Sequence, residues 1–71
     1  MLKKHSIIIA GHASSVTMEP EFWDELKKIS ERDGVSINQL VSAIDAERDG
    51  NLSSAIRLFV LNDLRKNSSG A

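Results

Sequence analysis

Hydrophobic side chains recur along the chain with two different spacings, and the change of spacing separates a short extended segment from three helices. In residues 13–18, Val16 and Met18 lie two positions apart with polar residues between them, the period of a strand with one buried face. A lone strand leaves its backbone N–H and C=O groups unpaired, which is costly once they are buried. We therefore expect a partner strand from elsewhere in the chain or from a second chain.

The first helix is expected to begin at Glu19-Pro20 and to end near Gly34. Proline suits the first turn of a helix because the N–H it lacks has no partner there, and acids are favoured at the positive end of the helix dipole. Glycine readily adopts the left-handed conformation that ends many helices. The apolar positions between these two signals keep helical spacing. They are Phe22, Trp23, Leu26 and Ile29.

Two further helices follow. Ser36 is a suitable N-cap for the second helix, and Gly50 and Asn51 are a suitable C-cap and N-cap between the second and the third. The linker around Gly34-Val35 is short enough to make the first two helices packed neighbours. The apolar positions of the second helix are Ile37, Leu40, Val41 and Ile44. Those of the third helix are Leu52, Ala55, Ile56, Leu58, Phe59, Val60, Leu61 and Leu64.

The third helix is apolar on more than one side, and such a helix has to be buried on more than one side. A single chain of 71 residues buries only about 60% of its unfolded surface, so it has little protein with which to cover this helix. We therefore predict a homodimer in which the second copy covers it. A different protein partner at the C-terminal helix is the alternative.

The isoleucine-rich run in residues 6–10 leaves three structures open. Gly11-His12 separates the run from the strand, and glycine reaches positive φ at little cost, which allows a tight hairpin with Gly11 in its turn. A flexible arm or an edge strand fits the same residues. The predicted organisation is a basic N-terminal arm or edge strand in residues 1–12, one domain with its C-terminal helix in residues 13–66, and a flexible tail in residues 67–71.

Composition narrows the setting in which such a chain works. With 41% hydrophobic residues, 27% charged residues and a net charge of −1, the chain has the make-up of a soluble globular protein. No apolar run approaches the roughly 20 residues of a membrane span, and the N-terminal apolar run is shorter than that of a signal peptide. The chain has no cysteine. We expect a cytoplasmic protein without disulfides.

Positive charge gathers at the end that carries the strand. Residues 1–18 contain Lys3 and Lys4 and no acid, whereas six acids lie in residues 19–33. Nucleic-acid-binding domains are usually strongly basic, whereas the sequence pI of this chain is about 6.0. Any DNA binding must therefore depend on local charge and on its doubling by a second chain.

Candidate catalytic and metal-binding groups are few. His5 and His12 lie outside any helical pattern, and solvent-exposed polar residues are the simplest interpretation, with a metal site as the alternative. Ser14 and Ser15 have no G-x-S-x-G context, and no glycine-rich phosphate-binding motif occurs. We expect neither enzymatic activity nor a metal or other cofactor.

The order of these elements resembles the ribbon-helix-helix superfamily of DNA-binding repressors, the group of the methionine repressor and Arc. The resemblance covers the span from His12 to about Arg48, about half of the chain. The matching residues are Ser15-Val16-Thr17-Met18-Glu19-Pro20-Glu21-Phe22-Trp23, Leu26, Ile29, Gly34-Val35-Ser36-Ile37-Asn38-Gln39-Leu40 and Ile44. Residues 6–64 also resemble a small bacterial subgroup, through Ile7-Ile8-Ile9-Ala10-Gly11-His12 and Gly50-Asn51-Leu52-Ser53-Ser54-Ala55.

The resemblance implies a fold and a function. The fold would be α+β and mostly α, with one short strand, a second N-terminal strand if residues 6–10 are extended, and three helices in an intertwined homodimer. The strands of the two chains would pair antiparallel and enter the major groove of double-stranded DNA. The protein would be a sequence-selective transcriptional regulator, either a repressor or an antitoxin-like autorepressor.

The resemblance also assigns site residues. The outward strand positions would face DNA bases, and these are Ala13, Ser15 and Thr17. Phosphates would be contacted by free backbone N–H groups at the start of the second helix and by basic groups near the N-terminus. These residues are Ser36, Ile37, Asn38, Lys3, Lys4 and His12. The dimer core would consist of Val16, Met18, Phe22, Leu26, Ile37, Leu40, Val41, Ile44, Ile56, Phe59 and Val60.

The outward face of the strand departs from the pattern of its relatives, which usually carry a long basic or amide side chain there. Bidentate bonds to guanine or adenine need arginine, lysine, asparagine or glutamine. Ala13, Ser15 and Thr17 offer only short groups. We therefore expect weak or shape-dependent sequence discrimination. The alternative function is a dimeric protein-interaction module, antitoxin-like or an adaptor, with weak or no DNA binding.

Overall fold

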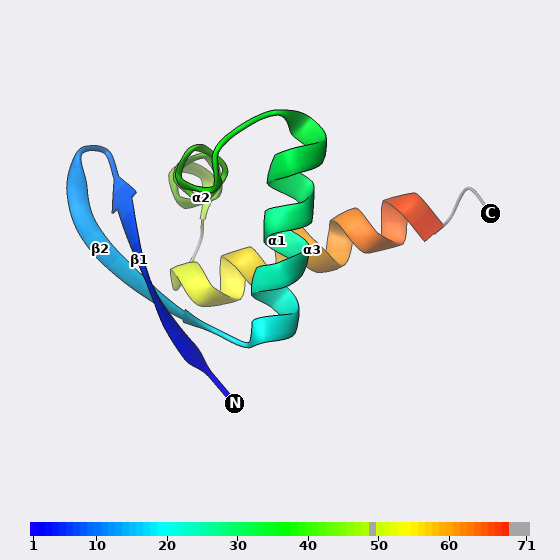
Figure 1. Cartoon of the computed structure of the whole chain (residues 1–71), viewed down its shortest axis with the longest axis horizontal. Coiled ribbons are helices and arrows are strands. Elements are labelled where there is room, and N and C mark those ends of the chain that lie inside the picture. The colour runs from blue at the N-terminus through cyan, green and yellow to red at the C-terminus, as the bar shows by residue number, and fades with distance from the viewer. Residues whose placement is uncertain (49, 69–71) are drawn as a thin grey trace.

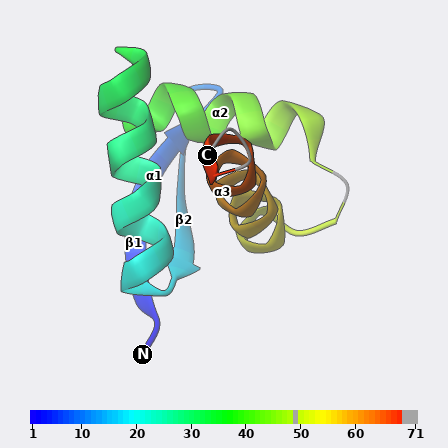
Figure 2. The ribbon, with the colours of Figure 1, turned by 90° about the vertical axis from the view of Figure 1, so that its right-hand side faces the viewer.

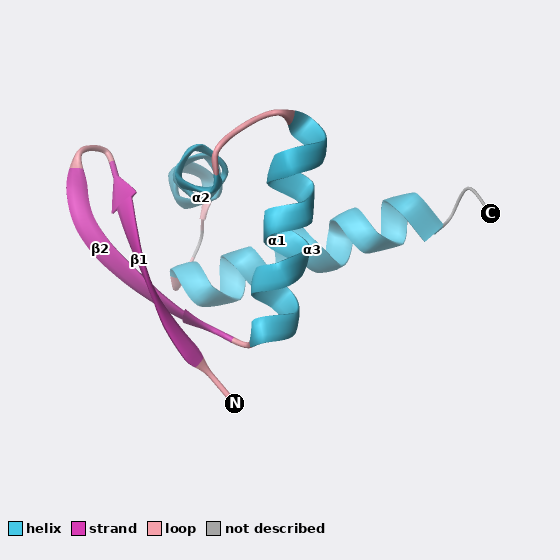
Figure 3. Cartoon of the chain, viewed as in Figure 1, coloured by secondary structure: helices cyan, strands magenta, loops and turns pink. Residues whose placement is uncertain are grey.

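Two antiparallel strands followed by three helices make up the chain in a computed structural model that describes residues 1–48 and 50–68 (Figure 1). The elements are β1 (Lys3–Ile9), β2 (His12–Met18), α1 (Pro20–Asp33), α2 (Ile37–Glu47) and α3 (Leu52–Ser68). The α+β, mostly helical class and the ribbon-helix-helix order expected from the sequence are confirmed. Figure 3 distinguishes the strands and helices from the loops that join them.

The isoleucine-rich run forms a hairpin with the expected strand, the first of the three alternatives. The pairing begins with Lys3 opposite Met18 and ends with Ile9 opposite His12. Both residues of the turn have positive φ, 52° at Ala10 and 80° at Gly11. Positive φ at both central residues is what a type I′ turn requires, and its twist matches that of the strands it joins. The sequence singled out Gly11, whereas the structure places Ala10 in the left-handed region as well.

Ala10 is a site where the hairpin stores strain, because a left-handed conformation costs an ordinary L-residue about 1–2 kcal/mol. Asparagine tolerates this region better, and Asn-Gly is the favoured type I′ pair. We expect Ala10→Asn to stabilise the chain by about 0.5–1 kcal/mol, which raises Tm by roughly 2–8 °C for a domain of this size. Thermal denaturation followed by circular dichroism measures the change. Gly11→Ala is the matched variant and should lower Tm; a rise with Gly11→Ala would contradict the turn geometry.

The first helix has the boundaries expected from its end signals. Pro20 occupies the first turn of α1. Gly34 follows the last turn with φ 71°, in the left-handed region, and the Val35 N–H donates to the Ser30 carbonyl at 3.0 Å. These contacts occupy carbonyl groups that a helix end otherwise leaves unpaired. The turn they form directs the chain into α2.

The other two helices begin at the expected N-caps. Ser36 Oγ accepts from the Gln39 N–H at 3.1 Å, and Gln39 Oε1 accepts in return from the Ser36 N–H at 2.8 Å, a complete capping box. Asn51 Oδ1 accepts from the Ser54 N–H at 2.8 Å at the start of α3. Each cap occupies a backbone donor that the first turn cannot pair. The N-terminal ends of α2 and α3 are therefore well defined.

The end of α2 differs from the prediction that Gly50 is its C-cap. The helix ends at Glu47, and Arg48 has the extended conformation of its cap. The Arg48 side chain bonds the Asp45 carboxylate at 2.6 Å and the Gly50 carbonyl. These side-chain bonds join Arg48 to the last turn of α2 and to Gly50, contacts that the glycine rule does not foresee. At the other end of the chain α3 reaches Ser68, so the predicted tail is helical at residues 67–68, and residues 69–71 lie outside the described part.

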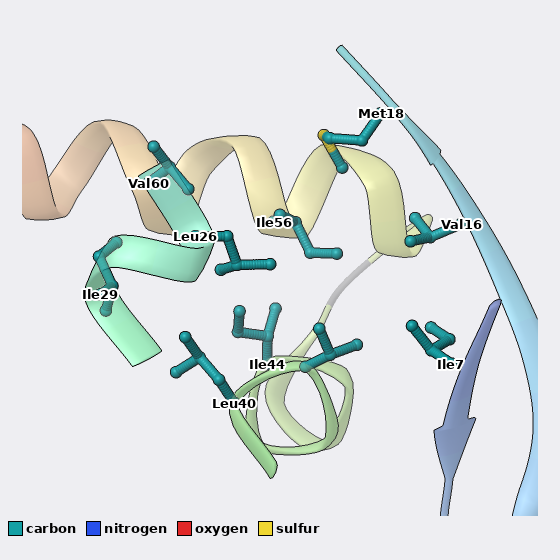
Figure 4. Packing of buried hydrophobic residues seen from close by; sticks show 10 residues of the cluster. Ile7, Val16, Met18, Leu26, Ile29, Leu40, Ile44, Ile56 and Val60 are labelled. Atoms are coloured by element: carbon teal, nitrogen blue, oxygen red, sulfur yellow. The ribbon is translucent and has the colours of Figure 1, made fainter. Parts of the chain in front are cut away.

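The core lies between the hairpin and the helices. β1 packs against α2 and β2 packs against α3, while α1 packs across both of these helices (Figures 1 and 2). Ile7 and Val16 point from the two strands toward the helices (Figure 4). The buried apolar residues are Ile7, Val16, Met18, Leu26, Ile29, Leu40, Val41, Ile44, Ile56 and Val60. Because Ile7 belongs to this core, β1 is part of the folded unit.

One side of α3 is not covered by the chain itself. Ile56 and Val60 are fully buried, but Leu58 is 59% exposed, and Leu61 and Leu64 are also exposed. The single chain thus buries one face of the helix that the sequence predicts to be apolar on several sides.

Candidate nucleic-acid interface

The outer surface of the hairpin carries six exposed side chains in three facing pairs. Strand side chains alternate between faces, and the buried Ile7, Val16 and Met18 define the inner face. The register sets Lys4 opposite Thr17, Ser6 opposite Ser15, and Ile8 opposite Ala13. We call these six residues the ribbon face, and all six are exposed. A twisted two-stranded ribbon of this kind has the dimensions to enter the major groove of DNA.

Half of the ribbon face could not be named from the sequence. The proposed base-facing residues Ala13, Ser15 and Thr17 lie on it. β1 adds Lys4, Ser6 and Ile8, which could not be assigned to a face because the sequence did not decide whether this segment forms a strand. The signal that could have identified them is the alternation of inward and outward side chains, which continues from β2 into β1 across the Ala10-Gly11 turn. Lys4 matters most, because it supplies the long cationic side chain that β2 lacks.

The start of α2 lies at the edge of the hairpin. Asn38 Oδ1 accepts from the backbone N–H of Ile8 at 3.3 Å, which ties the first turn of α2 to β1. The Ser36 N–H is used within the capping box, whereas the N–H groups of Ile37 and Asn38 are not part of it. Of the three proposed phosphate contacts in α2, Ile37 and Asn38 therefore keep the backbone donors for such a role.

The remaining proposed phosphate contacts are dispersed. Lys4 stands on the ribbon face. Lys3, its neighbour, lies in register with Met18 and so belongs to the opposite face, where its side chain is exposed. His12 is exposed beside the turn, opposite Ile9. The two lysines therefore present their charges on opposite faces of the hairpin.

The outer edge of β2 is held by α3. Ser53 Oγ donates to the Thr17 carbonyl at 3.1 Å. The Arg57 guanidinium binds both oxygens of the Glu19 carboxylate, at 2.8 and 3.1 Å. Hydrogen bonding to Arg57 lowers the pKa of Glu19, so this carboxylate stays ionised at neutral pH. The positive charge of Arg57 thus balances the negative charge of Glu19, the acid nearest to the end of β2.

The proposed dimer-core residues form part of one core within the chain. Most are buried, namely Val16, Met18, Leu26, Leu40, Val41, Ile44, Ile56 and Val60. Phe22, Ile37 and Phe59 are only partly buried and pack against that core. Ile7 and Ile29 are buried as well and were absent from the proposed set. An open groove between α2 and α3 is lined by Leu40, Ala43, Ile44, Leu58 and Phe59, among others.

The interpretation of His5 as a solvent-exposed residue is wrong. Its ring stacks on the indole of Trp23, with centroids 3.8 Å apart and planes 7° from parallel. Its Nε2 is buried without a hydrogen-bond partner among the described residues. The stack joins β1 to α1, and the alternation that places Ile7 inward places His5 inward too.

No group of three histidine, cysteine, aspartate or glutamate side chains is arranged to hold a metal ion in residues 1–48 and 50–68. Within the same ranges no helix is both long and apolar enough to cross a membrane.

Comparison with known proteins identifies the family. Residues 2–64 match the model of a ribbon-helix-helix domain. No curated protein and no solved structure matches the chain. Ribbon-helix-helix domains have a non-enzymatic DNA-binding fold and are generally transcription regulators or antitoxins. The match spans the hairpin, both capped helices and most of α3, and the chain belongs to the ribbon-helix-helix domain family.

Proposed function

We propose that the chain is a sequence-selective DNA-binding regulator that places its ribbon face in the major groove. The observation that carries this proposal is the division of the hairpin into two faces. The inner face is sealed on the helices by Ile7, Val16 and Met18, while the ribbon face carries hydroxyl groups, methyl groups and one ammonium group. Hydroxyls bond base edges, and methyl groups contact the thymine methyl.

The charges near the ribbon face also support DNA binding. Lys3 and Lys4 carry positive charge at one end of the hairpin, and the nearby Glu19 carboxylate is paired with Arg57. The backbone donors of Ile37 and Asn38 lie at the positive end of the α2 dipole, where anions such as phosphate are favoured. Lys3 and the backbone donors would position the hairpin, while the ribbon face, with Lys4, contacts bases. The regulator would act as a repressor on double-stranded DNA in the cytoplasm.

The homodimer expected from the sequence stays a prediction. The apolar surface left on α3 by Leu58, Leu61 and Leu64 would be covered by a second copy. The same surface favours a second candidate function, a protein-interaction module of the antitoxin or adaptor type with weak or no DNA binding. The net charge of −1 and the short side chains of β2 also favour that candidate.

A binding titration at two salt concentrations separates the two functions. Fluorescently labelled random genomic fragments are titrated with the protein at about 50 mM and about 200 mM salt. A regulator that neutralises several phosphates should bind at low salt and lose affinity steeply at the higher concentration, because bound cations are released from DNA. Absence of binding at low salt would exclude the regulator and leave the interaction module.

A further inference from the structure

We infer that a single chain builds the whole ribbon that two chains share in the ribbon-helix-helix dimers it resembles. β1 takes the place of a second chain's strand, and α3 takes the place of a second chain's α2. The DNA sequence that one ribbon contacts is then asymmetric. Lys4 is the main side chain with which the protein contacts bases. The closure of the ribbon within one chain stands on the contacts alone, whereas the role of Lys4 rests on the proposed function.

The two strands are related by a local two-fold axis. The register pairs Ser6 with Ser15, and a two-fold axis through that pair exchanges the antiparallel strands. It maps Ile7 onto Val16, which are 3% and 4% exposed. It also maps Ile8 onto Thr17, both on the ribbon face. The hairpin therefore repeats one pattern twice, as two identical strands from two chains would.

The starts of α2 and α3 obey the same relation. Asn38 is the second residue after the Ser36 cap, and its side chain bonds the outward N–H of Ile8. Ser53 is the second residue after the Asn51 cap, and its side chain bonds the outward carbonyl of Thr17. Ile8 and Thr17 are the positions that the axis exchanges. Each strand is thus bonded on its outer edge by the second residue of a capped helix and at residues that the axis exchanges, through the N–H of Ile8 in β1 and the carbonyl of Thr17 in β2.

The cores of the two helices continue the correspondence. Val41 lies five residues after its cap in α2, and Ile56 lies five residues after its cap in α3; both are fully buried. β1 packs on α2 as β2 packs on α3. α1 has no counterpart within the chain, so the repeat comprises one strand and one helix. In the family's two-chain arrangement the second strand and helix come from the partner.

The outer edges leave little room for a strand from elsewhere. A second chain's strand pairing with β2 would need the Thr17 carbonyl, which Ser53 already occupies. A strand pairing with β1 would need the Ile8 N–H, which Asn38 already occupies. The hairpin therefore satisfies by itself the requirement for a partner strand.

The ribbon face differs between its two halves, and this difference determines the target. β1 contributes Lys4, Ser6 and Ile8, whereas β2 contributes Ala13, Ser15 and Thr17. Lys4 is the one charged residue of the six, and lysine contacts guanine in the major groove. A two-chain ribbon would present each side chain twice and select an inverted repeat. A ribbon closed within one chain selects a non-palindromic sequence with guanine toward the Lys4 end.

A disulfide placed across the hairpin tests the closure without DNA. Ser6→Cys with Ser15→Cys introduces the only two thiols of a chain that has no cysteine, at directly opposed positions. After mild oxidation of dilute protein, non-reducing electrophoresis and mass measurement should find one disulfide within each monomer. The single variant Ser15→Cys should stay largely uncrosslinked. A covalent dimer as the main product of the double variant, or efficient dimerisation of the single variant, would overturn the inference.

A matched pair of lysine variants tests the role of Lys4. The probe is a duplex selected by the wild-type chain from a random library, together with copies in which single guanines are replaced. Lys4→Ala should weaken binding by about 5- to 150-fold and remove the preference at one guanine. Lys3→Ala removes the same charge from the other face and should weaken all duplexes about equally.

Two results would overturn the role of Lys4, namely an unchanged guanine preference in Lys4→Ala or a consensus that is palindromic within the base pairs that one ribbon covers. An inverted repeat of two separate asymmetric half-sites would instead report a dimer formed through α3. Failure of the wild-type chain to bind any duplex would instead contradict the proposed function. The disulfide result does not depend on that outcome.

Discussion

Thr17→Glu should weaken DNA binding by more than about 100-fold while the chain stays folded. The side chain of Thr17 stands on the ribbon face opposite Lys4, so a carboxylate there faces the negative DNA and also neutralises the lysine. Unfavourable like-charge contact in an interface costs several kcal/mol, and about 1.4 kcal/mol corresponds to tenfold in affinity. The fold should tolerate the change because opposite charges across a strand pair are mildly stabilising. Fluorescence anisotropy with the wild-type chain's preferred duplex measures the loss.

Ser14→Glu is the control for this experiment. Ser14 lies on the same strand and is exposed, but it belongs to the face opposite the ribbon face. The added charge is the same, and binding should fall far less. Equal losses in both variants would mean that overall charge rather than the ribbon face governs binding. A large drop in Tm for Thr17→Glu would mean that Thr17 points inward, with the register shifted by one residue.

Ile56→Ala should destabilise the chain by about 2–5 kcal/mol. Ile56 is fully buried on α3, and its side chain points into the core cluster near Leu26 (Figure 4). Small domains have total stabilities near the low end of about 5–15 kcal/mol, so the loss is a large fraction of the whole. Urea denaturation followed by far-ultraviolet circular dichroism measures it. The variant tests whether α3 is an integral part of the fold.

Leu58→Ala removes comparable volume from the exposed side of the same helix. Leu58 is 59% exposed, and exposed substitutions usually change stability by less than about 0.5 kcal/mol. Comparable costs at Ile56 and Leu58 would contradict the burial of one face of α3. A cost at Leu58 that grows with protein concentration would show that a second copy covers this face.

The helices could be predicted from the sequence because their signals are local. Proline and glycine delimit α1, and the caps Ser36 and Asn51 start the other two helices. Each signal acts within one turn, so neighbouring residues determine it. The end of α2 escaped prediction because Arg48 holds it through side-chain bonds to Asp45 and Gly50, and no backbone rule anticipates such bonds.

The site could be predicted only in part, because half of it depends on contacts between distant residues. The alternation of β2 was enough to assign Ala13, Ser15 and Thr17 to one face. Whether residues 3–9 form a strand depends on the bond from Ile8 to Asn38, 30 positions away, and on burial of Ile7 beneath α2. Without that strand Lys4 could not be assigned to a face of the hairpin, and the candidate interface lacked a long side chain. His5 was misjudged for the same reason, since Trp23 stacks on it from another element.

The side chains of Asn38 and Ser53 have a further consequence for the behaviour of the chain at high concentration. A sheet of two strands has two open edges, and unpaired backbone groups along an edge are templates on which other chains add strands and start aggregates. Asn38 occupies such a group on β1, Ser53 occupies one on β2, and lysines at the start of β1 repel an approaching copy. We therefore expect the bonds that hold the hairpin in place to disfavour the addition of further strands at both edges.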